Sequence, residues 1–145
     1  MKIIIVSGSL PDGMDRLLSA ARSEGVRNMD LLQAQWASGE QRFDRNGAAL
    51  FAALEGEELV AVGGVTPQTG LAEPAMRMRR FYVHPAHRRA GHGRALARAA
   101  MRRGFEQAPL LTCNARATAL AAPFWESLGF EPVRMPDITH ICRRR

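Results

Sequence analysis

A strand that stops at a proline, a short basic loop and a Gly-x-Gly that opens a helix follow one another in the middle of this chain. The strand ends at Val83-His84-Pro85, and Gly91-His92-Gly93 begins the helix. Glycine has no Cβ, so the backbone can close around a ligand, and the unpaired N–H groups of the first helical turn attract anions. Arg88 and Arg89 add positive charge at the same end. The segment therefore predicts a phosphate-binding loop between a strand and a helix.

Two familiar phosphate motifs do not fit this loop. A dinucleotide-binding fingerprint needs a third glycine, and its position is occupied by Leu96. A P-loop needs Gly-Lys-Ser or Gly-Lys-Thr, and the only lysine of the chain is Lys2. Taken alone, a single Gly-x-Gly is also compatible with tight packing of a helix on a strand. The motif alone therefore does not distinguish a phosphate-binding loop from close helix–strand packing.

Apolar periodicity predicts a mixed α/β domain. Strands are expected at residues 2–6, 48–54, 59–65, 76–83, 110–113, 130–133 and 138–142, with a hairpin at 55–58. Helices are expected after Gly13, from a cap at Asn28, over residues 91–105, and over residues 118–128. The stretch 66–74 is predicted to be a loop. Because no repeat or linker interrupts this order, residues 1–145 are expected to form a single domain.

Composition limits the class of protein. Hydrophobic residues make up 46% of the chain and charged residues 23%, which is typical of a globular protein. The apolar run at residues 3–6 is too short for a signal peptide or a membrane span, so a cytoplasmic location is expected. Cys113 and Cys142 lack the spacing of a metal site. They are expected to be reduced thiols, and no metal is expected.

The chain is strongly basic, with a net charge of +6, and every basic residue except Lys2 is an arginine. A basic balance favours a nucleic acid, a membrane lipid or a polyanionic small molecule as partner. The arginines crowd residues 77–103, but no basic platform with interleaved aromatics and no helix-turn-helix pattern accompanies them. We therefore expect no nucleic acid and no membrane as partner.

Two motifs occur together in the second half of the chain. Arg88-x-x-Gly91-x-Gly93 follows the strand, and residues 124–130, Phe-Trp-Glu-Ser-Leu-Gly-Phe, form an aromatic-Glu-x-Leu-Gly-Phe helix end. With the order of the elements, these motifs closely resemble the GNAT superfamily of N-acetyltransferases over essentially the whole chain. The resemblance implies an α/β fold with a mostly antiparallel sheet of about seven strands, about four flanking helices and a splay at the cofactor site.

The resemblance also implies acetyl-CoA as cosubstrate, with direct transfer of the acetyl group to a primary amine of a small molecule or peptide. The pyrophosphate would lie on the backbone amides of residues 89–94, and the pantetheine arm would pair with the strand at 81–83. The expected cofactor-binding residues are Phe81, Tyr82, Val83, Arg88, Arg89, Ala90, Gly91, His92, Gly93 and Arg94. A backbone N–H near Val83 would hold the carbonyl oxygen. A non-catalytic module that binds or senses CoA is the alternative.

The chain departs from this family at two positions. Where relatives often carry a tyrosine that protonates the leaving thiolate, this chain has Trp125, whose indole N–H is no acid in water. The position matched to a glutamate base holds Arg77, which cannot accept a proton. Tyr82 and His140 are weak alternative bases. The sequence therefore identifies neither the acid nor the base.

In the family's fold, the first two helices and the connection between the last two strands build the acceptor pocket. The residues expected there are Trp36, Arg42, Phe43, Arg77, Arg79 and the loop at 135–137. Arginines in such a pocket favour an acceptor with a carboxylate or phosphate. Because alternate residues of a strand face opposite sides, some of these arginines must point away. The sequence leaves open which ones do, and whether the chain forms a homodimer.

Overall fold

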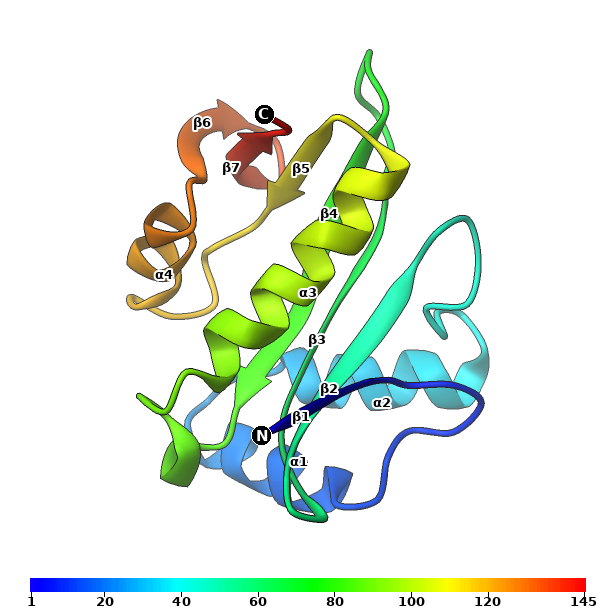
Figure 1. Ribbon diagram of the computed structural model, residues 1–145, viewed down its shortest axis with the longest axis vertical. Coiled ribbons are helices and arrows are strands. Elements are labelled where there is room, and N and C mark those ends of the chain that lie inside the picture. Colours follow the sequence, from blue (N-terminus) through cyan, green and yellow to red (C-terminus); the bar gives the residue numbers. More distant parts are fainter.

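The computed structural model of the chain describes residues 1–145 and contains one seven-stranded sheet with four α-helices (Figure 1). The order of the elements is the predicted one, and the α/β class is confirmed. Their bounds are β1 Lys2–Ile5, α1 Met14–Ser23, α2 Asn28–Ser38, β2 Ala49–Glu55, β3 Glu58–Gln68, β4 Ala75–Val83, the short 3-10 turn η1 Pro85–His87, α3 His92–Gln107, β5 Leu110–Cys113, α4 Ala121–Ser127, β6 Glu131–Met135 and β7 Ile138–Arg143.

The strands pair in the order β1-β2-β3-β4-β5-β7-β6, and only β4 and β5 run parallel. This parallel pairing is short, because it joins only Ala75–Arg77 to Leu110–Thr112. Beyond Arg77, β4 continues to Val83 while β5 and its following loop turn away from it (Figure 1). The predicted mostly antiparallel sheet with a splay between these strands is therefore confirmed.

Helices cover both faces of the sheet and bury two hydrophobic cores. α3 lies across one face, where Leu96 and Ala100 are fully buried (Figure 1). On the opposite face, Leu17 of α1 and Leu32 of α2 are fully buried in the second core. Burial of a leucine side chain contributes about 1.5–3 kcal/mol, so the amphipathic spacing of these helices is sufficient to fix them to the sheet.

The side chains of β4 divide between the two cores. Met76 and Met78 belong to the core under α3. Because side chains alternate along a strand, Arg77 and Arg79 point to the face that α1 and α2 cover. Strand β4 therefore has an apolar side toward α3 and a charged side toward α2.

A β-bulge interrupts this alternation. Gly63 of β3 opposes two residues of β4, Arg80 and Phe81, between the pairs that Arg79 and Tyr82 make. Arg80 has a φ of 62°, in the left-handed region that arginine seldom adopts. A Cβ on Gly63 would lie 2.2 Å from the Phe81 ring, so this position requires glycine. The bulge thus depends on a close approach between the two strands.

Two predicted boundaries are wrong by three residues. The loop expected at 66–74 begins later, since β3 runs on to Gln68 by pairing with Ala75–Arg77 of β4. This tertiary pairing overrides the turn preference of the local sequence. The last helix is also shorter than expected, because residues 118–120 form a turn and α4 starts at Ala121.

The predicted cap of α2 is wrong as well. Asn28 makes no cap hydrogen bond and is the first residue of the helix. Its side-chain Nδ2 donates instead to the carbonyl oxygen of Phe81 at 2.8 Å, which ties α2 to the bulge of β4.

Both cysteines are free thiols, Cys113 buried and Cys142 partly buried. None of the helices is both long enough and apolar enough to cross a membrane.

Candidate functional site

The loop between β4 and α3 holds a run of backbone N–H groups without acceptors in the protein. From Arg89 to Arg94 none of them donates, and the first that does is Ala95, to the Gly91 oxygen at 3.0 Å. Arg89 and Gly91 have φ values of 67° and 87°, and left-handed residues in a loop turn successive N–H groups toward one point. The dipole of α3 adds to the attraction. This geometry suits a diphosphate.

Arg88 is held by Glu24, which follows the end of α1. Its terminal nitrogens lie 2.7 and 2.6 Å from the two carboxylate oxygens of Glu24, and its Nε donates to the Val83 carbonyl at 3.1 Å. Glu24 also accepts a hydrogen bond from the Tyr82 hydroxyl. The hydrogen bonds from Arg88 and then Tyr82 lower the pKa of Glu24. The guanidinium of Arg88 thus fixes the loop to α1 and is already paired.

Two histidines tie the loop to the β2–β3 turn. His92 is buried, with Nε2 at 2.7 Å from a Glu55 oxygen and Nδ1 at 3.2 Å from the His87 carbonyl oxygen. His87 Nε2 lies 3.3 Å from a Glu58 oxygen. The side chain of His92 therefore faces the protein, and only its backbone N–H belongs to the run of N–H groups at residues 89–94. These residues are the candidate anion-binding loop, called the anion-binding loop from here on.

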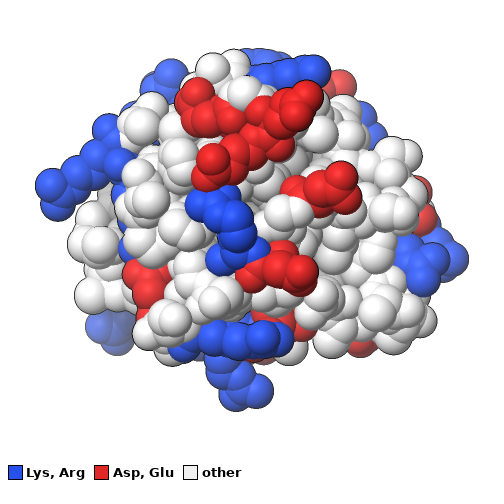
Figure 2. All heavy atoms as spheres, turned by 90° about the horizontal axis from the view of Figure 1, so that it is seen from below, with Lys and Arg blue, Asp and Glu red and all other residues white.

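Two arginines at this end of the molecule are paired with acidic side chains. Figure 2 views the end where α1 and the β2–β3 turn lie, and basic side chains alternate there with acidic ones. Arg88 pairs with Glu24, and Arg16 with Glu58 at 2.7 Å. Nucleic acids bind continuous basic patches or stripes, and the surface in this view is not one.

The open edge of β4 is the second feature of the site. Residues 78–83 have no strand on the side that β5 leaves. Phe81 and Val83 pack against the core under α3, and Tyr82 is buried on the opposite face. An unpaired strand edge can pair with an extended chain that carries amide groups. This edge leads from the bulge directly to the anion-binding loop.

Trp125 is a packing residue. It is 6% exposed, and its ring meets those of Phe81, Phe124 and Phe130 edge-on with centroids 4.9–5.1 Å apart. Gly93 comes close to the same cluster, because a Cβ there would lie 3.6 Å from Phe124. The indole thus holds α4 against β4, and it supplies no acid.

Both alternative bases are held in structural contacts. Burial, and then the hydrogen bond to Glu24, raise the pKa of the Tyr82 hydroxyl. His140 is buried, with Nε2 at 2.8 Å from a Glu126 oxygen and Nδ1 at 2.7 Å from Thr139 Oγ1. Neither side chain is free to take a proton from a ligand at the open edge of β4.

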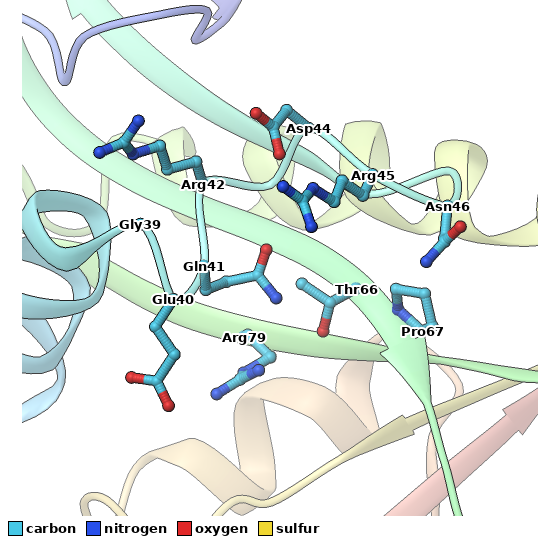
Figure 3. Close-up of a pocket in the computed structure, with 10 residues that line it drawn as sticks. All are labelled: Gly39, Glu40, Gln41, Arg42, Asp44, Arg45, Asn46, Thr66, Pro67 and Arg79. Carbon is cyan, nitrogen blue, oxygen red and sulfur yellow. The ribbon is translucent and has the colours of Figure 1, made fainter.

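A polar pocket of about 290 Å³ lies between the loop after α2 and strands β3 and β4 (Figure 3). Its lining consists of Gly39, Glu40, Gln41, Arg42, Asp44, Arg45, Asn46, Thr66, Pro67 and Arg79. Of the residues predicted for the acceptor pocket, Arg42 and Arg79 are present. Sequence reasoning misses Glu40, Arg45 and Thr66, because the loop after α2 carries no motif or periodicity.

The other residues predicted for the acceptor pocket lie elsewhere. Trp36 and Phe43 belong to the core, and the Trp36 indole donates to the Gly8 oxygen at 3.1 Å. Arg77 is on the same strand as Arg79 but does not line the pocket, and neither does the loop at 135–137. That loop is the turn between β6 and β7, and both strands lie at least three positions from β3 in the sheet.

The family described as "Acetyltransferase (GNAT) family" matches residues 14–130, which include the anion-binding loop, the β4 edge and the pocket. Among solved structures, a proposed acetyltransferase from Exiguobacterium sp. 255-15 is 29% identical, with a TM-score of 0.83. That match covers 99% of this chain and 94% of the other. A comparison with curated protein sequences finds no significant match.

Two further solved structures share the fold at lower identity. An aminoglycoside 6'-N-acetyltransferase from Acinetobacter haemolyticus is 19% identical, with a TM-score of 0.66 and 94% of each chain covered. A variant of the AtaT toxin, bound to the C-terminus of the antitoxin AtaR and to acetyl-CoA, is 16% identical, with a TM-score of 0.67 and coverage of 98% and 92%. The family match extends over most of the chain, and the fold agrees with it. The chain therefore belongs to the acetyltransferase (GNAT) family of enzymes.

Proposed function

We propose that the protein transfers an acetyl group from acetyl-CoA to a primary amine of a small molecule or peptide. The observation that carries the proposal is the run of N–H groups at residues 89–94 without protein acceptors, at the end of the open β4 edge. These amides would hold the pyrophosphate, and the backbone of residues 81–83 would pair with the pantetheine arm. Acetyl-CoA would supply the acetyl group as a reactive thioester.

The main contribution of the chain to catalysis is to position the amine against the thioester. The amine nitrogen attacks the thioester carbonyl carbon, the carbon–sulfur bond breaks, and the sulfur leaves as a thiolate. A backbone N–H at the bulge, beside Arg80 and Phe81, would donate to the carbonyl oxygen as negative charge grows on it. Holding two reactants in the right geometry can lower a barrier by roughly 7–11 kcal/mol.

The proton of the amine is lost to solvent in this proposal. Tyr82 and His140 are held in structural contacts, Trp125 packs, and Arg77 cannot accept a proton. The acceptor therefore reacts as the free amine. Below the pKa of that amine, kcat/KM should rise about tenfold for each pH unit, because only the unprotonated fraction reacts. A plateau near pH 7 would instead indicate a protein base and would contradict the reasoning.

Gly91→Ala tests the loop, and Gly70→Ala is its matched control. Both glycines have a left-handed φ, 87° and 84°, and a Cβ at either would meet nothing within 4 Å. The backbone strain, roughly 1–2 kcal/mol, is therefore similar in the two variants. In Gly91→Ala the free loop can relax from the left-handed conformation and must return to it to bind acetyl-CoA. Only this variant should therefore weaken acetyl-CoA binding, by about tenfold. Isothermal titration calorimetry measures the difference.

Acetyl transfer itself is measured as free CoA thiol in the presence of a panel of amines. We expect thiol release that depends on the amine. Equal weakening of acetyl-CoA binding by the two glycine variants would refute the assignment of the loop. Tight binding without thiol release from any amine would refute the transfer and favour a non-catalytic CoA-binding module.

A further inference from the structure

Three arginines of β4 lie together on the α2 face of the sheet with few partners. Alternation places Arg77 and Arg79 on this face, and the bulge adds Arg80. Arg80 Nη2 donates to Gln35 Oε1 of α2 at 3.1 Å, while its Nε is buried without a partner. Arg79 Nε is likewise buried without a partner. Charged groups withdrawn from water normally have partners, so this cluster points to a ligand of opposite charge.

The positive charge of Arg79 is not fully compensated by nearby negative charge. Burial, together with repulsion from Arg80 and Arg77, lowers its pKa to about 10, and attraction from Glu40 only partly opposes this. Thr66 Oγ1 lines the same pocket and is also buried without a partner. An anion with two or more oxygen atoms would supply acceptors for both groups.

The rest of the pocket contributes charge of both signs. Arg45 brings a further guanidinium group from the loop after α2, and Glu40 and Asp44 bring two carboxylates (Figure 3). Arg42 also lines the pocket, but its Nε donates to the Trp36 carbonyl oxygen at 2.8 Å. With Arg79 the lining thus has three positive and two negative side chains. Such a set suits a small molecule of mixed charge, whose anionic group meets the arginines and whose amine lies near a carboxylate.

Arg79 belongs both to the lining of the pocket and to the open edge of β4. Arg79 is two residues beyond Arg77, where pairing with β5 ends, and two residues before Phe81 at the open edge. Two residues of a regular strand extend about 7 Å, and the bulge at Arg80 makes the span from Arg79 to Phe81 shorter. A ligand whose anionic group and amine are a few bonds apart can therefore bind at Arg79 and present its amine to the edge.

We propose that the acceptor is a small primary amine with a carboxylate or phosphate, and that Arg79 binds this group together with Arg45 and the Thr66 hydroxyl. The inference rests on the acetyl transfer proposed above and names its substrate class. Guanidinium groups bind either oxyanion through paired N–H donors. Carboxylate and phosphate share this chemistry, and the test includes both.

The test compares amines that differ in their anionic group. β-Alanine is compared with propylamine, and O-phosphoethanolamine with ethanolamine, each with acetyl-CoA and the release of free thiol as the readout. For at least one pair we expect kcat/KM to be roughly 10- to 100-fold higher for the anionic amine, the range that a charge-assisted hydrogen bond supplies.

Arg79→Gln should remove most of this preference by raising KM for the anionic amine, and Arg79→Lys should retain part of it. Arg102→Gln is the matched control, because Arg102 is an exposed arginine of α3, the helix on the opposite face of the sheet. The Arg79 side chain has no hydrogen-bond partner at its buried Nε, and its backbone pairing with β3 is kept in the variants, so its replacement should leave the melting temperature and acetyl-CoA binding unchanged. This separates loss of the anion site from misfolding.

The two proposals fail in different ways. Equal turnover of the paired amines, or a preference that survives in Arg79→Gln, overturns the anionic acceptor and leaves acetyl transfer standing. If no amine is acetylated, acetyl transfer is refuted, and calorimetry with the same four amines tests the anion site. Binding of the anionic amines that is lost in Arg79→Gln supports the site, and binding that is absent or unchanged overturns it.

Discussion

Replacement of Glu24 tests how the anion-binding loop is held, because this carboxylate joins the loop arginine to a buried tyrosine. In Glu24→Ala the buried Tyr82 hydroxyl loses its acceptor, which costs about 1–2 kcal/mol. Arg88 loses a partner in a pair whose side chains are 41% and 32% exposed, which adds about 0.5–1 kcal/mol after screening by solvent. We expect a loss of about 1.5–3 kcal/mol. Glu24→Gln keeps an oxygen for Tyr82 and should cost about 1 kcal/mol or less.

The assay is urea unfolding near neutral pH, with Tyr82→Phe combined with Glu24→Ala in a double-mutant cycle. The coupling energy should be about 1 kcal/mol, because the two side chains share one buried hydrogen bond. Asp30→Asn is the control. Asp30 pairs with Arg22 at 2.7 Å in an exposed position, so its loss should leave stability unchanged.

The contribution of Glu24 should also depend on pH with a definite sign. Its pKa in the folded protein is lowered below the usual value of about 4.5 by the hydrogen bonds from Arg88 and Tyr82. The carboxylate therefore stabilises the fold fully above the unfolded pKa, and this contribution is lost as the pH falls through the lowered pKa. The stability difference between the wild type and Glu24→Gln should shrink below about pH 4.

One result would refute this account of the loop. If Glu24→Ala were no more destabilising than Asp30→Asn, and the Tyr82 cycle gave no coupling, the contacts of Glu24 would not hold the loop. Acetyl-CoA affinity measured on the same variants gives a second readout. It should fall several-fold in Glu24→Ala and stay unchanged in Asp30→Asn.

Three further outcomes are expected. Gly63→Ala should destabilise the protein by about 1–3 kcal/mol, because its Cβ would lie 2.2 Å from the Phe81 ring. Urea unfolding with the same midpoint as the wild type would contradict this. Burial raises the pKa of the Cys113 thiol to about 12, so iodoacetamide should modify the less buried Cys142 first, as peptide mass spectrometry can show. His140→Ala should lower the melting temperature yet leave the pH dependence of kcat/KM unchanged in shape, whereas a change in that shape would restore His140 as a base.

Most of the fold could be predicted because its signals are local. The apolar positions of α1, Met14, Leu17, Leu18 and Ala21, recur at helical spacing and are all buried. The end of β3 could not be predicted in this way. Its last residues form a strand only because β4 pairs with them. This pairing is a tertiary contact, and the local sequence favours a turn instead.

The anion-binding loop has a local sequence signal, and the pocket has none. Glycine spacing and chain order place residues 89–94 at a helix start, so sequence reasoning could find the loop. The loop that carries Glu40 and Arg45 has no such pattern. Its position depends on Phe43, whose ring packs so closely on Gly64 that a Cβ there would lie 2.8 Å away. Contacts of this kind join segments far apart in the chain, and no periodicity records them.

The bulge of β4 decides what both faces of the sheet can do. With strict alternation after Arg79, Arg80 and Tyr82 would point into the core under α3, where Glu24 could not reach the tyrosine. The extra residue opposite Gly63 keeps Arg80 beside Arg79 on the α2 face and returns Tyr82 to the face of α1. A bulge re-aims side chains in this way wherever one is inserted. The same insertion thus adds Arg80 to the arginines of the α2 face and permits the tyrosine contact that secures the anion-binding loop, so both features depend on a single irregularity of one strand.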